Sequence, residues 1–226
     1  VRFDTMSNMK TQWHGNRIKT EFIRAGDLDD ICGMLEKESV CRWLFFGPNI
    51  LKLRERNFTP FIESIARETS REKVPGSPVF TIRVKDTGQF CGQCAILPVE
   101  YCPGAYLVGY QIDDGFTGMG FGTEACEFLI YYAFTQTDAY RLNGDAAYEN
   151  TASWKIMEKC GFLFEAGEAN TGMHAAGAMT RYCTGYEKKI WTRRILMAWP
   201  LSGNPDSAGR RILREKNAEP DIHMGR

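Results

Sequence analysis

The sequence has no excess of charge of either sign and no long apolar run. Its 226 residues contain 28 Lys and Arg against 28 Asp and Glu, so the formal net charge is zero. Nucleic acids and anionic membrane surfaces usually attract proteins with a basic excess, and we expect neither as a partner. No stretch approaches the ~20 apolar residues of a membrane-spanning helix. Residues 1–10 lack the apolar segment of a secretory signal, which predicts a soluble, cytoplasmic protein.

Histidine is scarce, with 3 residues in the chain, and this argues against a zinc site. Cys91 and Cys94 have the spacing of a zinc knuckle or a redox dithiol, but only Cys102 follows nearby and no His does. A closed zinc site needs a second pair of ligands. The segment also alternates like a strand, whereas redox motifs of this spacing open a helix. We therefore expect that the protein binds no metal and that its thiols are buried or half-buried. A zinc- or thiol-dependent protein is the least favoured alternative.

Length and hydrophobic periodicity predict one α/β domain with an extension at each end. The domain is expected at residues 15–192, between extensions at 1–14 and 193–226. Predicted strands span 16–24, 79–84, 89–97, 105–113 and 140–148, and a final hairpin joins 162–168 to 179–188. Predicted helices begin near residues 27, 59 and 121, and a fourth spans 151–160. This order is typical of a mixed sheet with helices packed on it.

Two of the predicted helices have a defined apolar stripe. The first is expected to have Thr59 as its N-cap and Pro60 in its first turn, and to bury Phe61, Ile62, Ile65 and Ala66. The second is expected to bury Phe121, Ala125, Phe128, Leu129, Tyr132 and Ala133.

The strongest local signal is a glycine cluster between a predicted strand and a predicted helix. It contains Gly118, Gly120 and Gly122 at alternate positions. Without side chains, successive backbone N–H groups can face an anion, and the helix N-terminus adds partial positive charge, as in a diphosphate site. No Lys follows as in a P-loop, and the spacing and the preceding antiparallel strands differ from a dinucleotide-binding fold. A tight, closely packed turn without a ligand is the alternative.

A second motif extends from Asn150 to Phe162. Asn150 is expected to cap a helix and Gly161 to end it. The inward-facing residues of this helix are expected to be Ala152, Ile156 and Met157. Taken alone, the motif predicts only a well-formed short helix.

Together, at this separation, the two motifs resemble the GNAT superfamily of acetyl-CoA-dependent N-acyltransferases, and within it the RimJ/RimL-like branch. The resemblance covers residues 16–190 and includes the opening segment 17–30 and the pair Gly109-Tyr110. It implies the GNAT fold, an α/β fold with a mixed central sheet of about six to seven strands flanked by helices. It also implies an N-acetyltransferase in which a primary amine attacks acetyl-CoA directly. The acceptor would be a protein N-terminus or a small molecule, and the enzyme a monomer or homodimer.

The resemblance further implies where the cosubstrate acetyl-CoA binds. The diphosphate would lie on the glycine cluster, and the pantetheine arm would pair with the end of the preceding strand. The expected cofactor-binding residues are Gln111, Ile112, Asp113, Thr117, Gly118, Met119, Gly120, Phe121, Gly122, Thr123, Asn150 and Ser153. Thr117 departs from the family pattern, which has Arg or Gln there, so we expect weaker or altered affinity.

The catalytic residues are less constrained by the resemblance. Met157 stands where many family members have a Tyr that serves the leaving thiolate, and Met cannot donate a proton. Ser153 is therefore expected to take that role, although a hydroxyl at a helix start can also bond to the backbone. Tyr148 and Glu149 are the candidate catalytic groups nearest the reaction centre by motif position.

Other assignments stay open. Glu100 and His174 are further candidate general bases, and proton loss to water is also compatible with the chemistry. The aromatic residues Trp43, Phe45 and Phe46 are expected either to shape the acceptor pocket or to pack in the core. A catalytically idle acyl-CoA-binding or sensing protein is the main alternative function.

Overall fold

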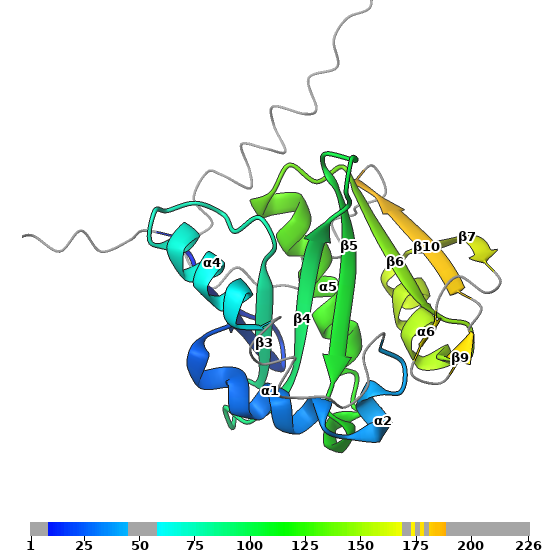
Figure 1. The fold of residues 1–226 in the computed structure, drawn as a ribbon, viewed down its shortest axis with the longest axis horizontal. Coiled ribbons are helices and arrows are strands. Elements are labelled where there is room, and N and C mark those ends of the chain that lie inside the picture. The colour runs from blue at the N-terminus through cyan, green and yellow to red at the C-terminus, as the bar shows by residue number, and fades with distance from the viewer. Residues whose placement is uncertain (1–8, 45–57, 169–172, 175–176, 179–180, 189–226) are drawn as a thin grey trace, which may run out of the picture.

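The structure, a computed structural model, describes residues 9–44, 58–168, 173–174, 177–178 and 181–188 (Figure 1). The helices are α1 (Leu28–Leu35), α2 (Glu38–Cys41), α4 (Thr59–Thr69), α5 (Phe121–Gln136) and α6 (Thr151–Cys160). Two short 3-10 helices are η1 (Ala25–Asp27) and η3 (Asp114–Phe116). The strands are β1 (Gln12–His14), β2 (Ile18–Phe22), β3 (Val79–Val84), β4 (Phe90–Pro98), β5 (Ala105–Ile112), β6 (Arg141–Ala147), β7 (Leu163–Glu168), β8 (Met173–His174), β9 (Gly177–Ala178) and β10 (Arg181–Glu187).

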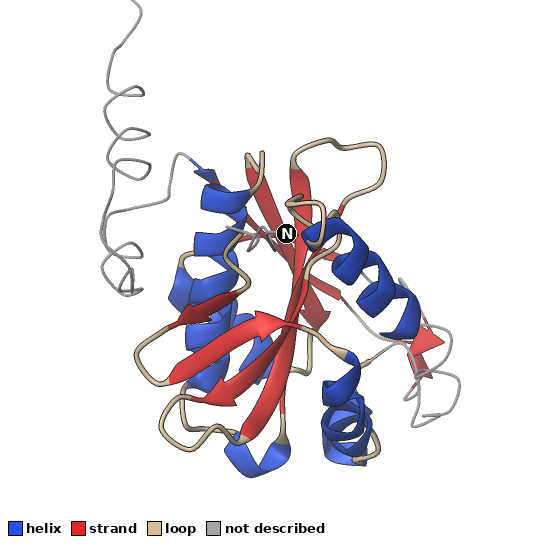
Figure 2. Ribbon diagram, turned by 90° about the vertical axis from the view of Figure 1, so that its left-hand side faces the viewer, coloured by secondary structure: helices blue, strands red, loops and turns tan. Residues whose placement is uncertain are grey.

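One mixed sheet organises the domain. Its eight strands have the order β1-β2-β3-β4-β5-β6-β10-β7, and only β5 and β6 pair in parallel. α4 and α1 lie over one face of the sheet, and α5 lies over the other, where α6 packs beside it (Figures 1 and 2). No helix in the described part of the chain is long and apolar enough to cross a membrane. The predicted mixed sheet with flanking helices is confirmed, although it has 8 strands rather than six to seven.

The core lies mainly between the sheet and α5. All six apolar residues predicted to face inward from α5 are buried. Trp13 packs edge-on against Phe22, Phe80 and Tyr132, and Phe80 makes an edge contact with Phe128. Edge-to-face contacts of this kind stabilise a core beyond the apolar area they bury.

Several local predictions were wrong. The sheet begins with β1 inside the predicted N-terminal extension, and Trp13 is 1% exposed. The N-cap of α4 is Phe58 rather than Thr59, which is already the first helical residue. Ala66 and Ala152 are exposed because each lies on the solvent side of an amphipathic helix. Isolated alanines in a helical pattern carry little information about burial, since Ala occurs on both faces.

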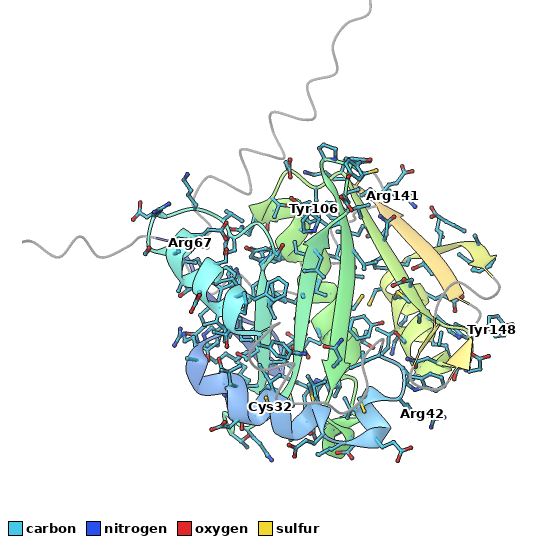
Figure 3. All side chains as sticks on the ribbon, in the orientation of Figure 1. Cys32, Arg42, Arg67, Tyr106, Arg141 and Tyr148 are labelled. Carbon is cyan, nitrogen blue, oxygen red and sulfur yellow. The ribbon has the colours of Figure 1, made fainter. Side chains whose placement is uncertain are left out.

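The divergence of β5 from β6 positions the candidate site. The two strands pair only where Ala105–Leu107 of β5 lie beside Arg141–Asn143 of β6. Figure 3 labels Tyr106 and Arg141 at this paired end of the sheet. Beyond it the strands separate toward the end of β5 (Figure 1). No described strand pairs with this edge of β5 at residues 108–112, so its backbone groups are available to a ligand.

Candidate active site

The glycine cluster forms the turn between η3 and α5. Gly118 and Gly120 have φ of +74° and +83°, in the left-handed region that favours glycine, and Gly120 caps α5. The first N–H groups of a helix lack partners within that helix. No described group outside α5 accepts a bond from the N–H groups of Phe121, Gly122 or Thr123. These donors, with the positive end of α5, form a site that fits a diphosphate.

Arg17 lies against this turn, a residue that sequence reasoning did not assign to the site. Its Nη1 donates to the Met119 carbonyl oxygen at 2.6 Å, and its guanidinium stacks 5.1 Å from the ring centre of Phe121. A Cβ on Gly120 would come 2.8 Å from Arg17 Nη2. Arg17 therefore places a positive charge at the turn, although Thr117, at the position where the family has Arg or Gln, carries none. In the sequence, the only sign of a role for Arg17 was its place in the opening segment of the family resemblance.

The middle and C-terminal end of α6 pack against the start of α5. A Cβ on Gly122 would come 2.8 Å from Ile156 Cδ1, so the missing side chain allows α6 to approach α5 closely. Cys160 Sγ donates to the Thr123 carbonyl oxygen at 3.6 Å. The structure thus brings together the two motifs that carried the sequence interpretation.

Asn150 and Gly161 bound α6 as predicted. The Asn150 side-chain oxygen accepts a bond from Ser153 N at 3.3 Å, and Gly161 ends the helix at φ +101°. Because the cap uses the oxygen, the amide nitrogen of Asn150 can still donate to a ligand. Met157 is 1% exposed and faces the core, as predicted, so it takes no direct part in the site.

Ser153 pairs with Tyr110, a contact that sequence reasoning did not foresee. Ser153 Oγ donates to Tyr110 Oη at 3.4 Å, and Tyr110 Oη donates to the Ser153 carbonyl oxygen at 2.8 Å. Burial raises the pKa of Tyr110 well above its ordinary value, so its phenol stays protonated. This pair links α6 to β5 next to the unpaired edge, where a thioester could lie. The sequence contained Gly109-Tyr110 as a family feature but gave no sign of this contact.

The carboxylates at the end of β5 are already engaged. Lys37 Nζ lies 2.7 Å from both Asp113 Oδ2 and Asp114 Oδ1. The hydrogen bonds to these two acids raise the pKa of Lys37, and those from Lys37 and Ser39 lower the pKa of Asp114. Lys37 therefore neutralises negative charge that would otherwise face a diphosphate.

The other predicted residues have different surroundings. Thr117 Oγ1 donates to the Asp114 carbonyl oxygen at 3.0 Å. Tyr148 is 56% exposed, and its ring lies at the edge of the molecule (Figure 3). Glu149 and Glu100 are also exposed. The structure thus connects Ser153 to β5 through Tyr110, and it gives Tyr148 and Glu149 no enclosed environment.

Two further predictions concern residues that are only partly described. Trp43 is half-buried beside Arg42, whose guanidinium lies 4.4 Å from its ring centre, while Phe45 and Phe46 lie outside the described residues. His174 falls in β8, a two-residue strand in the connection between β7 and β10.

Cys91 and Cys94 lie within β4 and are buried. Burial raises the pKa of the Cys91 thiol to about 12 and that of Cys94 well above its ordinary value. Protonated, enclosed thiols are poor nucleophiles and poor ligands. Across the described ranges, no group of three or more His, Cys, Asp or Glu side chains could hold a metal ion.

A cavity of about 220 Å³ lies on the face of β4 and β5 that α4 covers, opposite the face on which α5 packs. α4 covers it with Phe58 and Phe61, and the two strands supply its floor, including Gln93 and Gln111. Gln111 was predicted as a cofactor contact because of its place near the end of β5. Its side chain accepts a hydrogen bond from Gln93 at 3.0 Å.

Comparisons with known proteins identify the family of this chain. Residues 17–163 match the family model described as "Acetyltransferase (GNAT) domain". The chain is 29% identical over 136 residues to the putative ribosomal N-acetyltransferase YdaF of Bacillus subtilis. The aligned region covers 60% of this chain and 70% of YdaF. The family match confirms the predicted resemblance.

Solved structures show the same fold. A ribosomal L7/L12 α-N-protein acetyltransferase, RimL, in complex with coenzyme A has a TM-score of 0.65 at 13% identity, covering 76% of this chain and 94% of that one. A spermidine N-acetyltransferase from Vibrio cholerae, in complex with CoA and spermine, has a TM-score of 0.62 at 15% identity, covering 76% and 96%. These similarities confirm the predicted GNAT fold.

Proposed function

The chain belongs to the GNAT acetyltransferase family, and from that premise we propose that it transfers the acetyl group of acetyl-CoA to a primary amine. One observation carries this proposal. The unpaired edge of β5 leads through η3 to the turn at the start of α5, where no described group outside the helix accepts a bond from the first N–H groups. An extended ligand with a diphosphate at one end and amide groups along its arm fits that arrangement.

In this proposal the diphosphate of acetyl-CoA lies on the turn of residues 117–123. The N–H groups of Phe121, Gly122 and Thr123 donate to its oxygens, and Arg17 adds positive charge beside Gly120. The amide groups of the pantetheine arm pair with the unpaired edge of β5, where Val108, Tyr110 and Ile112 direct their backbone groups, whereas the backbone groups of Gln111 are directed to β4. Asp113 has little left to offer the arm, because Lys37 and the Gly115 N–H occupy its carboxylate. Its backbone N–H donates to the Cys91 carbonyl oxygen, and its carbonyl oxygen accepts from the Phe116 N–H.

The reaction is one displacement at the thioester. The neutral amine nitrogen attacks the carbonyl carbon, the new C–N bond forms, and the C–S bond breaks. The thiolate leaves as coenzyme A and accepts a proton, and the amine loses one. Ser153 supplies a hydroxyl to the leaving sulfur, and Tyr110 holds the Ser153 end of α6 in place through its carbonyl oxygen.

The amine proton needs less help from the protein. Tyr148 and Glu149 follow β6 on the other side of the divergence, and both are exposed. As exposed groups they can relay a proton to solvent. Water is therefore a sufficient proton acceptor for amines that have a neutral fraction at the working pH.

Release of coenzyme A measures the activity directly. Purified protein is incubated with acetyl-CoA and a panel of amines, namely amino-acid amides, short peptides and spermidine, and free thiol is followed with time. Acetylated product identified by mass spectrometry, together with amine-dependent thiol release, supports the proposal. Tight binding of acetyl-CoA without product from any amine would instead identify an acyl-CoA-binding protein.

A further inference from the structure

The cavity beneath α4 has a mostly apolar lining, and its floor includes the small residues Ala95 and Gly109. Side chains alternate along strands, so the cross-strand pairs Ala95–Gly109 and Leu97–Leu107 share the face that α4 covers. No described atom lies within 4 Å of a Cβ built on Gly109. The floor is therefore hollow because this position has no side chain.

One polar group in this cavity lacks a partner. Gln93 is 6% exposed and lines the floor, and its Nε2 donates to Gln111 Oε1. Its Oε1 is buried and accepts no hydrogen bond from any described residue. A buried acceptor without a donor costs about 1–3 kcal/mol, and a ligand with an N–H group would remove that cost. The occupant that satisfies Gln93 therefore carries a donor.

The cavity has no charged lining among the residues that the structure describes. A polyamine would bring several positive charges into this mostly apolar space, where no described lining residue has a carboxylate to pair them, at a large desolvation cost. The volume of about 220 Å³ lies below the ~300–1,000 Å³ of drug-sized sites, so it suits one small apolar group.

The cavity also adjoins the proposed reaction centre. Gly109 and Gln111 lie on β5 within the stretch whose far edge is unpaired. A ligand in the cavity and an acyl arm on that edge would therefore contact the same short segment of backbone.

We propose that this cavity is the acceptor subsite, that it takes a monoamine with an uncharged apolar group beside its amino nitrogen, and that Gln93 Oε1 orients this nitrogen. The inference rests on the proposed function, whose acceptor it specifies. The amine N–H donates to Gln93, and the apolar group lies over Gly109 beneath Phe58 and Phe61. Gly109 sets the size of the group, and Gln93 positions the nucleophile.

Calorimetric titration of amines tests the subsite independently of turnover. Leucinamide, alaninamide, lysinamide and spermidine are titrated into the protein with and without coenzyme A. Leucinamide is expected to bind about tenfold or more tightly than lysinamide or spermidine, a difference of about 1.4 kcal/mol. Equal or tighter binding of spermidine would overturn the inference.

Two variants probe the cavity directly. Gly109→Leu fills it and is expected to weaken leucinamide binding about tenfold while alaninamide binding changes less. Gln93→Met keeps the length of the side chain but removes the acceptor, and should weaken both amines about tenfold without changing coenzyme A affinity. If the leucine variant does not fold, Gly109→Ala should shift leucinamide affinity in the same direction by less.

A matched control and a rival occupant complete the test. Gly33→Leu adds the same side chain at an exposed position of α1 outside the cavity and should leave amine binding unchanged. Unchanged leucinamide affinity in Gly109→Leu would overturn the inference. Hexanoyl-CoA is the probe for the rival occupant, an acyl chain. If Gly109→Leu loses hexanoyl-CoA binding while its amine binding is unchanged, the cavity holds an acyl chain and the inference is overturned. Failure of every amine to release coenzyme A would overturn the proposed function, whereas the titrations would still decide the inference.

Discussion

Arg17 and Glu124 are 107 positions apart in the sequence and meet at the start of α5. Glu124 Oε1 accepts bonds from the backbone N–H groups of Arg17 and Ile18, at 2.9 and 3.2 Å. Arg17 Nε lies 3.3 Å from Glu124 Oε2. Glu124 is buried, and Arg17 is half-exposed beside the glycine turn. The carboxylate therefore fixes the entrance of β2 against α5 and aims the guanidinium at the proposed diphosphate site.

Replacing Arg17 is expected to weaken cofactor binding more than it weakens the fold. In Arg17→Ala the carbonyl oxygen of Met119 loses its donor, and the turn loses a cation near the phosphates. We expect the Kd for acetyl-CoA to rise about tenfold, since bonds to charged groups are worth about 1.5–3 kcal/mol. Binding is measured by calorimetry and stability by urea unfolding.

Arg24→Ala is the matched control. The exposed Arg24 side chain forms an ion pair with the mostly buried Glu21 at 3.5 Å, and pairs at the surface contribute about 0–1 kcal/mol. Its acetyl-CoA affinity should equal that of the wild type. Equal affinity in Arg17→Ala as well would show that Arg17 only supports the fold.

The elements with strong local patterns were predictable, and the contacts between them were not. The stripe of α5, the cap at Asn150 and the end of α6 at Gly161 each depend on nearby residues, so the sequence pattern determined them. β1 has three residues and one apolar side chain, Trp13, which is too short for a period to appear. Tyr110, Arg17 and Gln93 became candidates only through partners distant in the sequence, which no local spacing reveals.

Gly120→Glu is expected to abolish acetyl-CoA binding. The new carboxylate would lie in the anion site, and its Cβ would start 2.8 Å from Arg17 Nη2. A non-glycine residue at φ +83° also costs about 1–2 kcal/mol of stability. Gly118→Ala is the control. Gly118 also has a positive φ, but a Cβ there has open space around it, so this variant introduces backbone strain without blocking the site.

Both glycine variants are compared by binding titration and urea unfolding. Gly118→Ala should lose similar stability but retain measurable affinity for acetyl-CoA. Wild-type affinity in Gly120→Glu would be incompatible with a diphosphate site at this turn.

Ser153→Ala is expected to lower kcat about tenfold to hundredfold while the Kd for acetyl-CoA is unchanged, because the hydroxyl acts on the leaving sulfur rather than in binding. Thr151→Ala changes another hydroxyl, exposed in the same first turn of α6, and should keep wild-type kinetics. Steady-state thiol release measures both variants. A wild-type kcat in Ser153→Ala would remove Ser153 from the chemistry.

The buried thiols give a prediction about pH. The reactive form of cysteine is the thiolate, and burial raises the pKa of Cys91 to about 12. At about pH 8, iodoacetamide should therefore label the exposed Cys102 in the folded protein and leave Cys91 and Cys94 unmodified, as read by peptide mass mapping. Rapid labelling of either buried thiol without unfolding would contradict this environment.

The same shift affects stability. The folded-state pKa of Cys91 lies above its ordinary value of 9.0, so the unfolded chain loses this proton first as the pH rises. The contribution of the buried thiol is complete below about pH 9 and declines as the pH rises toward 12. Cys91→Ser, which does not titrate in this range, should reduce that alkaline decline in urea unfolding curves.

Binding of acetyl-CoA at the glycine turn is the property on which the proposed function depends most. A thermal-shift titration with acetyl-CoA, free coenzyme A and ATP measures it directly. At a hundred times its Kd a ligand stabilises the fold by about 2.7 kcal/mol, which raises the melting temperature by several degrees. Stabilisation by both coenzyme A species and not by ATP is the predicted result. No shift with either coenzyme A species would contradict the assignment of this turn as the cofactor site.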